Sequence, residues 1–319
     1  MEIKINSGER FCDKTVLSVL KSLSMSSRMI KFLKYSENGI VVNGTRVSVR
    51  YILRDGDTLS LGTEDSSSSE HAIPVELEFD IIYENDDLMV VNKPPFMPTH
   101  TSHGHYDDTL ANALAGYYAS KNIPFVFRPV NRLDRNTSGL VLVAKNKLSA
   151  AFMTAAMKSH KIQKSYISLL EGQLEEPSVT VESHGMRLGV IDAPLHRTAE
   201  SIITREVCAR DVEDAEDAIT HYRILQKNEK CTLVEAFPVT GRTHQLRVHF
   251  AHLGHPIIGD ELYGTPSPYI ARHALHAKTL SFPLPTDRLA DDQGEKRIFL
   301  EAPLPKDIIE LTKIYFENN

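Results

Sequence analysis

A short polar segment divides the chain into two unequal parts. Residues 62–70 read Gly-Thr-Glu-Asp-Ser-Ser-Ser-Ser-Glu, and they hold no side chain that a hydrophobic core could bury. Apolar patterns run on both sides of this segment, so each side is expected to form its own core. A chain of 319 residues also has the length of about two domains. We predict an N-terminal module over residues 1–61, a flexible linker over 62–74 and a larger domain over 75–319.

The two parts differ in charge. Residues 1–61 hold ten Lys and Arg against six Asp and Glu, and since the whole chain carries −6, the remaining residues carry −10. The N-terminal part is therefore expected to bind an anion, and the net charge excludes a uniformly basic surface.

No apolar run is long enough for a membrane-spanning helix, and the start lacks the apolar core of a secretion signal. We expect a cytoplasmic protein with no membrane partner, whose three cysteines are reduced thiols.

The N-terminal part shows helical patterns first and strand patterns later. Leucines at 17, 20 and 23 have helical spacing, and Ser26-Ser27 is a candidate N-cap for a second helix. Two apolar runs then flank an Asn43-Gly44 turn, which is typical of a hairpin. Two short helices followed by a small twisted sheet are the expected result.

A basic stripe runs along the second of these helices. Arg28, Lys31 and Lys34 follow one another at i, i+3 and i+6, so they share a face that could follow RNA phosphates. An ordinary solvated helix face is the alternative interpretation. The order of elements, with Ser-Ser-Arg opening the basic helix and a Val-Asn-Gly hairpin after it, resembles the small RNA-binding module first seen in the fourth protein of the small ribosomal subunit.

The larger part mixes strand and helix patterns without a strict alternation, which predicts the α+β class rather than a doubly wound sheet. The expected arrangement is a mixed, mainly antiparallel sheet flanked by helices, with a central cleft. Strands are predicted over residues 77–83, 88–91, 140–144, 166–170 and 231–237, and helices over 109–119, 148–157 and 243–253.

One polar loop leads directly into a strongly apolar strand. Residues 131–139 read Asn-Arg-Leu-Asp-Arg-Asn-Thr-Ser-Gly before Leu140, and such a junction is a rigid mount for a carboxylate. Asp134 has Arg132 and Arg135 close by, and a guanidinium favours the ionised form of a carboxylate. The aspartate could therefore act as a nucleophile or a base. The alternative is that Asp134 only caps the turn that follows it.

A second polar segment precedes the last predicted helix. Arg242 lies just ahead of the expected N-cap Thr243, where it could face inward. His249, His252 and His255 recur every three residues, but Gly254 should end the helix before the third histidine, and no carboxylate or cysteine shares their face. We therefore expect no metal site.

A third candidate, Tyr166, lies in a strand made otherwise of core residues. There it is either a half-buried packing residue or a platform on which a base stacks.

Several of these segments together resemble the RluA branch of the pseudouridine synthases. The resemblance spreads over most of residues 75–305, and the N-terminal module is a common companion in that family. The matching motifs are Asn92-Lys93-Pro94, the Arg132-Leu133-Asp134 loop with Thr137-Ser138-Gly139, Lys164 with Tyr166, Ile191 to Pro194, Gly241 to His249, Gly254 to Pro256 with Gly259-Asp260, and Leu275 to Ala277.

The resemblance implies an enzyme that isomerises uridine to pseudouridine in RNA without a metal or cofactor. It implies that Asp134 is the catalytic aspartate, that Tyr166 stacks on the target uracil and that Arg242 pairs with the aspartate. Arg132 would fill the space that the flipped uridine leaves. Whether Asp134 attacks the anomeric carbon or removes a ribose proton stays open at this level.

One residue departs from the family pattern. The loop usually has a histidine where this chain has Asn131, and we expect activity to survive with altered hydrogen bonding in the loop.

Large-subunit ribosomal RNA is the favoured partner over tRNA, and a monomer is expected because no interface pattern is visible. An RNA-binding protein that keeps the fold without catalysis is the main alternative. A glycoside hydrolase is disfavoured, because such enzymes generally need two placed carboxylates.

Overall fold

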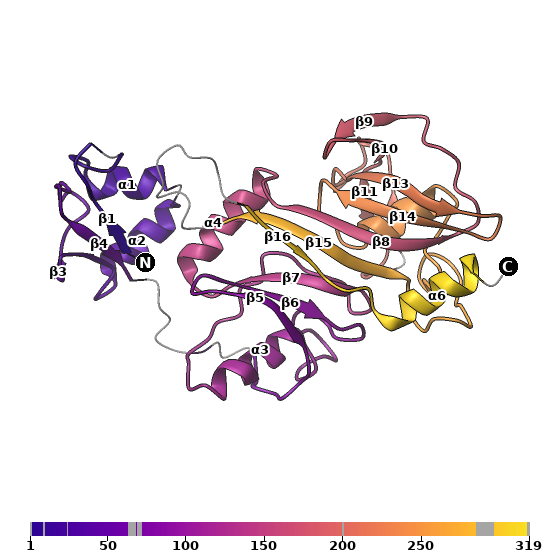
Figure 1. The fold of residues 1–319 in the computed structure, drawn as a ribbon, viewed down its shortest axis with the longest axis horizontal. Helices are drawn as coiled ribbons and strands as arrows, with labels where there is room; N and C mark the ends of the chain where they lie inside the picture. The colour runs from indigo at the N-terminus through magenta and orange to yellow at the C-terminus, as the bar shows by residue number, and fades with distance from the viewer. Residues whose placement is uncertain are drawn as a thin grey trace.

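The computed structural model describes residues 2–317 except for positions 9, 24, 63–67, 69–71, 200 and 285–296. Most of the predicted linker therefore lies outside the described residues. The chain before it forms a small unit, residues 2–62, which we call the N-terminal unit (Figure 1). Its elements are β1 (Glu2–Lys4), α1 (Val16–Ser22), α2 (Ser27–Tyr35), β2 (Ile40–Val42), β3 (Thr45–Arg46) and β4 (Thr58–Leu61).

The N-terminal unit has the predicted helices and hairpin, and one strand that the sequence did not reveal. The Ser26 side chain accepts a hydrogen bond from Met29 N at 3.2 Å, as expected of an N-cap. Asn43 and Gly44 have φ of 50° and 79°, and positive φ at both central residues is what a type I′ hairpin turn requires. The missed strand is β1, which joins the sheet order β1-β4-β2-β3. Three residues with one buried side chain, Ile3, are too short a pattern to predict.

This unit has a hydrophobic core of its own. The apolar faces of α1 and α2 pack on the small sheet, and all buried members of the cluster lie between residues 3 and 61. On its outer side it contacts α4 (Lys147–Lys158), because Leu148 packs against the cluster and Lys147 Nζ lies 4.2 Å from the centre of the Phe32 ring. Figure 1 shows the unit at one end of the molecule, next to α4.

The larger part of the chain is built on a ten-stranded sheet. Its order is β5-β6-β7-β15-β8-β14-β13-β10-β9, with β16 also paired to β15. Every pair is antiparallel except β7 with β15. The strands are β5 (Asp80–Glu84), β6 (Leu88–Lys93), β7 (Ser138–Ala144), β8 (Gln163–Glu171), β9 (Thr180–Ser183), β10 (Met186–Asp192), β13 (Ile219–Lys227), β14 (Cys231–Pro238), β15 (Leu275–Pro283) and β16 (Arg297–Glu301). This confirms the predicted α+β class with a mixed, mainly antiparallel sheet.

Helices cover both faces of this sheet, and a small hairpin stands apart from it. Successive side chains of a strand point to opposite faces; accordingly Met89 packs in one core cluster with α3, and its neighbour Leu88 packs in another with α4. All seven residues of β7 are buried, because this strand lies in the middle of the sheet. The remaining elements are α3 (Leu110–Ala119), α5 (Gln245–His252), α6 (Lys306–Phe316) and the hairpin β11 (Leu195–Arg197) with β12 (Arg205–Val207).

Several element boundaries differ from the sequence prediction, and β8 begins at Gln163 rather than at residue 166. The strand expected from residue 77 begins only at Asp80. The N-cap of α5 is His244 rather than Thr243, and it makes no side-chain capping bond. In place of a cap, the Gln245 side-chain oxygen accepts hydrogen bonds from Arg242 N and Thr240 Oγ1 at 3.0 and 2.7 Å. The loop before α5 is thus held by the side chain of a helix residue, Gln245. A sequence search for N-cap residues does not detect such a contact.

Candidate active site

The four site residues predicted in the larger domain line a single cleft. Asp134, Tyr166, Arg132 and Arg242 all border a cavity of about 660 Å³. Asp134 and Arg132 lie in the loop between residues 131 and 137, which leads into β7. Tyr166 lies on β8, and Arg242 precedes α5. The topology therefore brings together segments that are more than a hundred residues apart in the chain.

Several buried side chains hold the loop that carries Asp134. Thr99 Oγ1 donates to Leu133 O at 2.8 Å and accepts from Leu133 N at 3.2 Å. The ammonium group of Lys93 donates to Arg135 O at 3.2 Å, and also to Pro94 O and Met97 O. Burial lowers the pKa of Lys93 to about 7, while the charge of Asp134 acts in the opposite direction. A loop anchored through its backbone in this way is a preorganised mount for a reacting carboxylate.

Asn131 joins the start of the loop to the adjacent strand. Its Nδ2 donates to Leu140 O at 3.1 Å, and its Oδ1 accepts from Leu142 N at 2.8 Å. Asn131, which stands where the family usually has a histidine, thus satisfies two backbone groups of β7.

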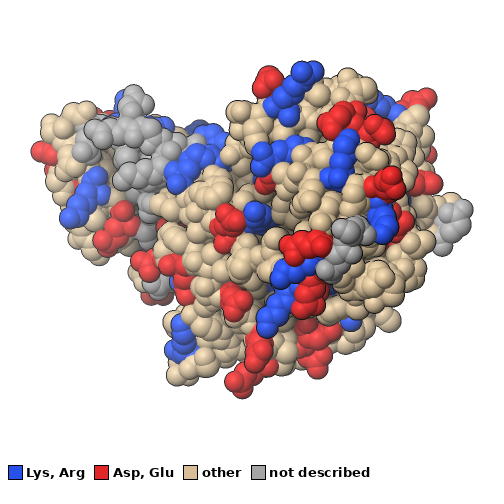
Figure 2. All heavy atoms as spheres, turned by 45° about the vertical axis from the view of Figure 1, so that its right-hand side comes forward, with Lys and Arg blue, Asp and Glu red and all other residues tan. Residues whose placement is uncertain are grey.

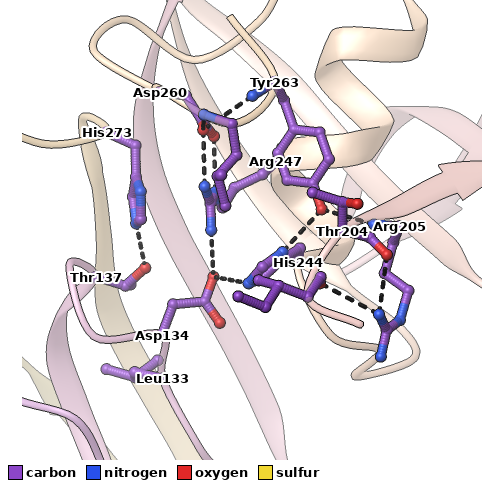
Figure 3. Close-up of polar contacts among 12 residues, drawn as sticks. Leu133, Asp134, Thr137, Thr204, Arg205, His244, Arg247, Asp260, Tyr263 and His273 are labelled. Carbon is purple, nitrogen blue, oxygen red and sulfur yellow. Dashed lines mark hydrogen bonds and ion pairs between the residues drawn. The ribbon is translucent and has the colours of Figure 1, made fainter. Parts of the chain in front are cut away.

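The Asp134 carboxylate faces the cleft and does not cap its own turn. The turn is closed by Thr137 N donating to the backbone oxygen of Asp134 at 3.1 Å. The carboxylate instead has Arg247 Nη1 at 3.4 Å and His244 Nε2 at 4.0 Å, both measured to Oδ2 (Figure 3). Since both neighbours approach Oδ2, Oδ1 is the oxygen that is open to a substrate. The side chain keeps 28% of its surface accessible.

Arg247 is held in place by a second carboxylate behind it. Its Nε and Nη2 each donate to Asp260 at 2.7 Å, a bidentate pair in which Asp260 is fully buried (Figure 3). Burial disfavours both charges, but their pairing raises the pKa of Arg247 and lowers the pKa of Asp260. Arg247 is therefore a fixed cation that offers its remaining nitrogen to Asp134.

The predicted pairing of Arg242 with Asp134 is wrong. Arg242 donates from Nη1 to Glu216 at 2.9 Å and from Nε to Asp217 O at 3.0 Å, at the outer side of the cleft. The arginine beside Asp134 is Arg247, five residues further on. The buried residues of α5 are not all apolar, since they include Gln245, Arg247 and His249. The periodicity of apolar residues could not show this, because Asp260, which positions Arg247, lies outside the helix, 13 residues further along the chain.

Tyr166 is buried in the cleft wall, at 7% exposure. Burial and the nearby charge of Asp134 both raise the pKa of its phenol, so the ring stays neutral near pH 7. Lys164, two residues earlier on β8, also borders the cleft, and burial lowers its pKa. Arg132 is exposed at the cleft rim.

Charged side chains of both signs are mixed on one face of the molecule (Figure 2). On the face in Figure 2, Lys and Arg side chains are interspersed with Asp and Glu, which agrees with the net charge of −6. The predicted RNA-binding residues Arg28, Lys31 and Lys34 are all exposed on α2, with Ile30 and Leu33 on its buried side. They therefore form a local basic face of the N-terminal unit.

Two of the histidines near α5, His249 and His255, are engaged in hydrogen bonds with the protein. His249 contacts Thr220 Oγ1 at 2.9 Å and Ala193 O at 3.0 Å, and His255 contacts Glu171 O at 2.8 Å. Within the described ranges, no group of three or more His, Cys, Asp or Glu residues is arranged to hold a metal ion. Nor does any helix in the described part of the chain have the length and apolarity to cross a membrane.

Comparisons with known proteins define the family. A family profile described as RNA pseudouridylate synthase matches residues 87–252. Two Bacillus subtilis proteins, the uncharacterized RNA pseudouridine synthases YjbO and YhcT, are 32% and 33% identical to this chain. The matches span 94% and 99% of this chain and 98% and 97% of those proteins. Ribosomal large subunit pseudouridine synthase D of Zymomonas mobilis is 34% identical, over 78% of this chain and 76% of its own length.

A solved structure supports the same family. Human RNA pseudouridylate synthase domain containing 1 superposes with a TM-score of 0.53 and 26% identity, over 75% of this chain and 94% of the human chain. The family match thus defines an isomerase that converts uridine to pseudouridine in RNA. This chain belongs to the RNA pseudouridylate synthase family.

The N-terminal unit has a different match. A profile described as FHA domain covers residues 27–62, which span α2 and three strands of the small sheet. This match does not test the resemblance to the ribosomal RNA-binding module, which stays a prediction.

Proposed function

We propose that this enzyme modifies specific uridines in structured RNA, with large-subunit ribosomal RNA as the substrate and Asp134 as the catalytic aspartate. The observation that carries this proposal is the arrangement of the Asp134 carboxylate. One oxygen faces the fixed cation Arg247, and the other is open to a cleft that Tyr166 also borders. Relatives named ribosomal large subunit pseudouridine synthase D favour ribosomal RNA over tRNA.

The reaction exchanges one glycosidic bond for another. The bond from ribose C1′ to uracil N1 breaks, the base turns within the cleft, and C1′ bonds to C5, which loses its hydrogen while N1 gains one. Asp134 Oδ1 would either attack C1′ to form an ester or take the C2′ proton to form a glycal. Both routes need an ionised carboxylate in a confined site, and Arg247 supplies the compensating charge there.

A base in RNA must leave its stack before this chemistry can occur. We assign Tyr166 as the platform for the extruded uracil, because its neutral ring borders the cleft with Asp134. The raised pKa of the phenol disfavours a role as a base near neutral pH. Arg132 extends from the same loop at the rim and would fill the gap left in the RNA. Arg242 is assigned to the RNA backbone at the outer side of the cleft.

The N-terminal unit is assigned to RNA binding through Arg28, Lys31 and Lys34. These exposed cations lie on one helix face, and Lys and Arg contacts to phosphates position a protein on RNA without reading sequence. We propose a division into a binding module at 1–61, a linker at 62–74 and a catalytic domain at 75–319. We further propose that the enzyme acts as a monomer in the cytoplasm, with no metal or cofactor.

The proposal is tested by incubating the purified protein with unmodified large-subunit rRNA fragments and with tRNA. Pseudouridine is then mapped by carbodiimide labelling and primer extension. We expect defined stops in the rRNA after treatment with the native enzyme and none with Asp134→Asn, which keeps the side-chain shape. Stops only in tRNA would overturn the substrate assignment. Equal modification by Asp134→Asn would overturn the role of the aspartate.

A protein that binds RNA without modifying it is the alternative. It would give equal RNA affinity for the native chain and Asp134→Asn, and no labelled sites on any rRNA or tRNA tested. Retention of a carboxylate beside a buried guanidinium argues against it, because RNA phosphates repel a carboxylate.

A further inference from the structure

His244 combines a strained backbone with a fully specified side-chain environment. Its φ is 57°, in the left-handed region that residues other than glycine rarely adopt. Such strain costs about 1–3 kcal/mol and persists where the surroundings impose it, most often at functional sites. The His244 side chain is only 10% exposed and lies between Asp134 and Tyr263 (Figure 3).

A chain of hydrogen bonds favours one tautomer of this imidazole. Arg205 N donates to the Tyr263 hydroxyl oxygen at 2.9 Å, and that hydroxyl contacts His244 Nδ1 at 2.8 Å. The backbone amide can only donate, so the phenol accepts there and its own hydrogen is free for Nδ1. A neutral imidazole that accepts at Nδ1 carries its hydrogen on Nε2. This is the nitrogen that faces Asp134 Oδ2 at 4.0 Å (Figure 3).

The surrounding charges are consistent with a neutral ring. Asp134 and Asp260 favour protonation of His244, Arg247 and Arg205 oppose it, and burial has the largest effect and lowers its pKa. The positive charge next to Asp134 is therefore that of Arg247, and His244 adds a neutral N–H. At 4.0 Å the contact is longer than a hydrogen bond, and contacts of this kind often shorten only when substrate binds.

We propose that His244 is a positioning residue for Asp134: its Nε2–H bonds Oδ2 in the RNA complex and turns Oδ1 toward the ribose, and Tyr263 holds the ring in the tautomer that this requires. Arg247 and His244 then hold one carboxylate oxygen from two directions, which leaves the other as the reacting atom. The inference rests on the role of Asp134 proposed above.

Two substitutions at His244 separate positioning from simple packing. His244→Gln keeps an amide N–H near the place of Nε2, whereas His244→Asn tolerates the positive φ better but is too short to reach Asp134. In single-turnover reactions at saturating RNA, we expect the Asn variant to be roughly 10–100-fold slower, as for loss of an outer-shell partner, and the Gln variant to recover most of the rate. RNA affinity and melting temperature should stay near native values. If the Asn variant reacts at the native rate, or if both variants fall equally, the inference is wrong.

Tyr263→Phe tests the tautomer. Loss of the phenol removes a donor to the neutral ring, so the pKa of His244 should rise and the acid limb of the rate profile should move to higher pH. A cation at His244 would weaken the reactivity of Asp134. In a His244→Gln background the same change should leave the pH profile unmoved, since glutamine does not titrate. A loss of rate that is equal at every pH would assign Tyr263 a structural role only.

Asp134→Asn is run alongside to separate the two hypotheses. If that variant is active, the proposed function fails. If it is inactive while the His244 and Tyr263 variants behave like the native enzyme, only this inference fails.

Discussion

Replacing Arg247 by methionine should destabilise the catalytic domain through Asp260. That carboxylate has no exposed surface, and it accepts two hydrogen bonds of 2.7 Å from the guanidinium. Without Arg247, the donors that remain among the described residues are the backbone amides of Leu262 and Tyr263. Breaking a buried ion pair by removing one partner costs about 3–5 kcal/mol, and we expect a loss of this size at pH 8.

The pH dependence of the loss has a definite sign. In the native protein the pKa of Asp260 is lowered, so the pair contributes stability above about pH 4 that is lost as the pH falls further. In Arg247→Met, burial without a cation should raise this pKa above its unfolded value. The destabilisation should therefore be smaller at pH 5 than at pH 8, because the carboxyl can take up a proton.

A matched double variant separates stability from activity. Arg247→Met with Asp260→Asn removes the unpaired charge and keeps an oxygen for the two backbone amides, so it should recover at least half of the lost stability. It should remain inactive, because Asp134 still lacks its cation. Calorimetry is the suitable assay, since the chain contains no tryptophan. A loss below about 1 kcal/mol in the single variant, or no recovery in the double, would refute the reasoning.

Four further substitutions test separate parts of the account. Gly139→Ala should destabilise the enzyme by on the order of 3 kcal/mol, because φ is +113° and the new Cβ would lie 2.2 Å from Ala277 O; a native melting temperature would contradict this. Asn131→Ala should cost about 1–3 kcal/mol in thermal denaturation by leaving two buried backbone groups unpaired, and a loss of rate without a loss of stability would point instead to a direct role. Arg242→Ala should change stability by less than about 1 kcal/mol but lower the slope of RNA affinity against salt by about one; an unchanged slope would remove its assignment to a phosphate. His249 has its pKa lowered to about 4 by burial, so native stability should fall between pH 6.5 and 4, and His249→Gln should flatten that fall in melting curves; a parallel curve would show that another group titrates.

The elements with strong local patterns were predictable from the sequence. The apolar run of β7, the hairpin at Asn43 and the N-cap at Ser26 each depend on a few neighbouring residues, and each is present. The short β1 and the start of α5 were missed, because partners distant in the chain determine them. The Gln245 side chain, for example, organises the preceding loop by reaching β13 at Ile219 O and Thr220 Oγ1.

The cleft was predictable as a set of segments but not as a set of contacts. Asp134 and Tyr166 could be singled out because a polar loop before an apolar strand and a tyrosine within a core-like strand are visible in the sequence, and the roles proposed for them came from the resemblance to the family. The partner of Asp134 could not be read in the same way, since two arginines lie within one motif and only the buried Asp260 distinguishes them. His244 lies in the matching motif Gly241 to His249, but the sequence predicted no role for it, because neither its positive φ nor its contact with Tyr263 can be recognised from the local sequence.

The most direct test of the central claim is release of the C5 hydrogen. RNA transcribed with uridine tritiated at C5 loses one tritium to water for each uridine converted, whichever route Asp134 takes. With large-subunit rRNA fragments we expect release by the native enzyme to reach a plateau of whole sites per RNA molecule. Asp134→Asn should release none, although it binds the RNA as well as the native enzyme. Release by the variant, or no release by the native enzyme on any rRNA fragment, would contradict the account.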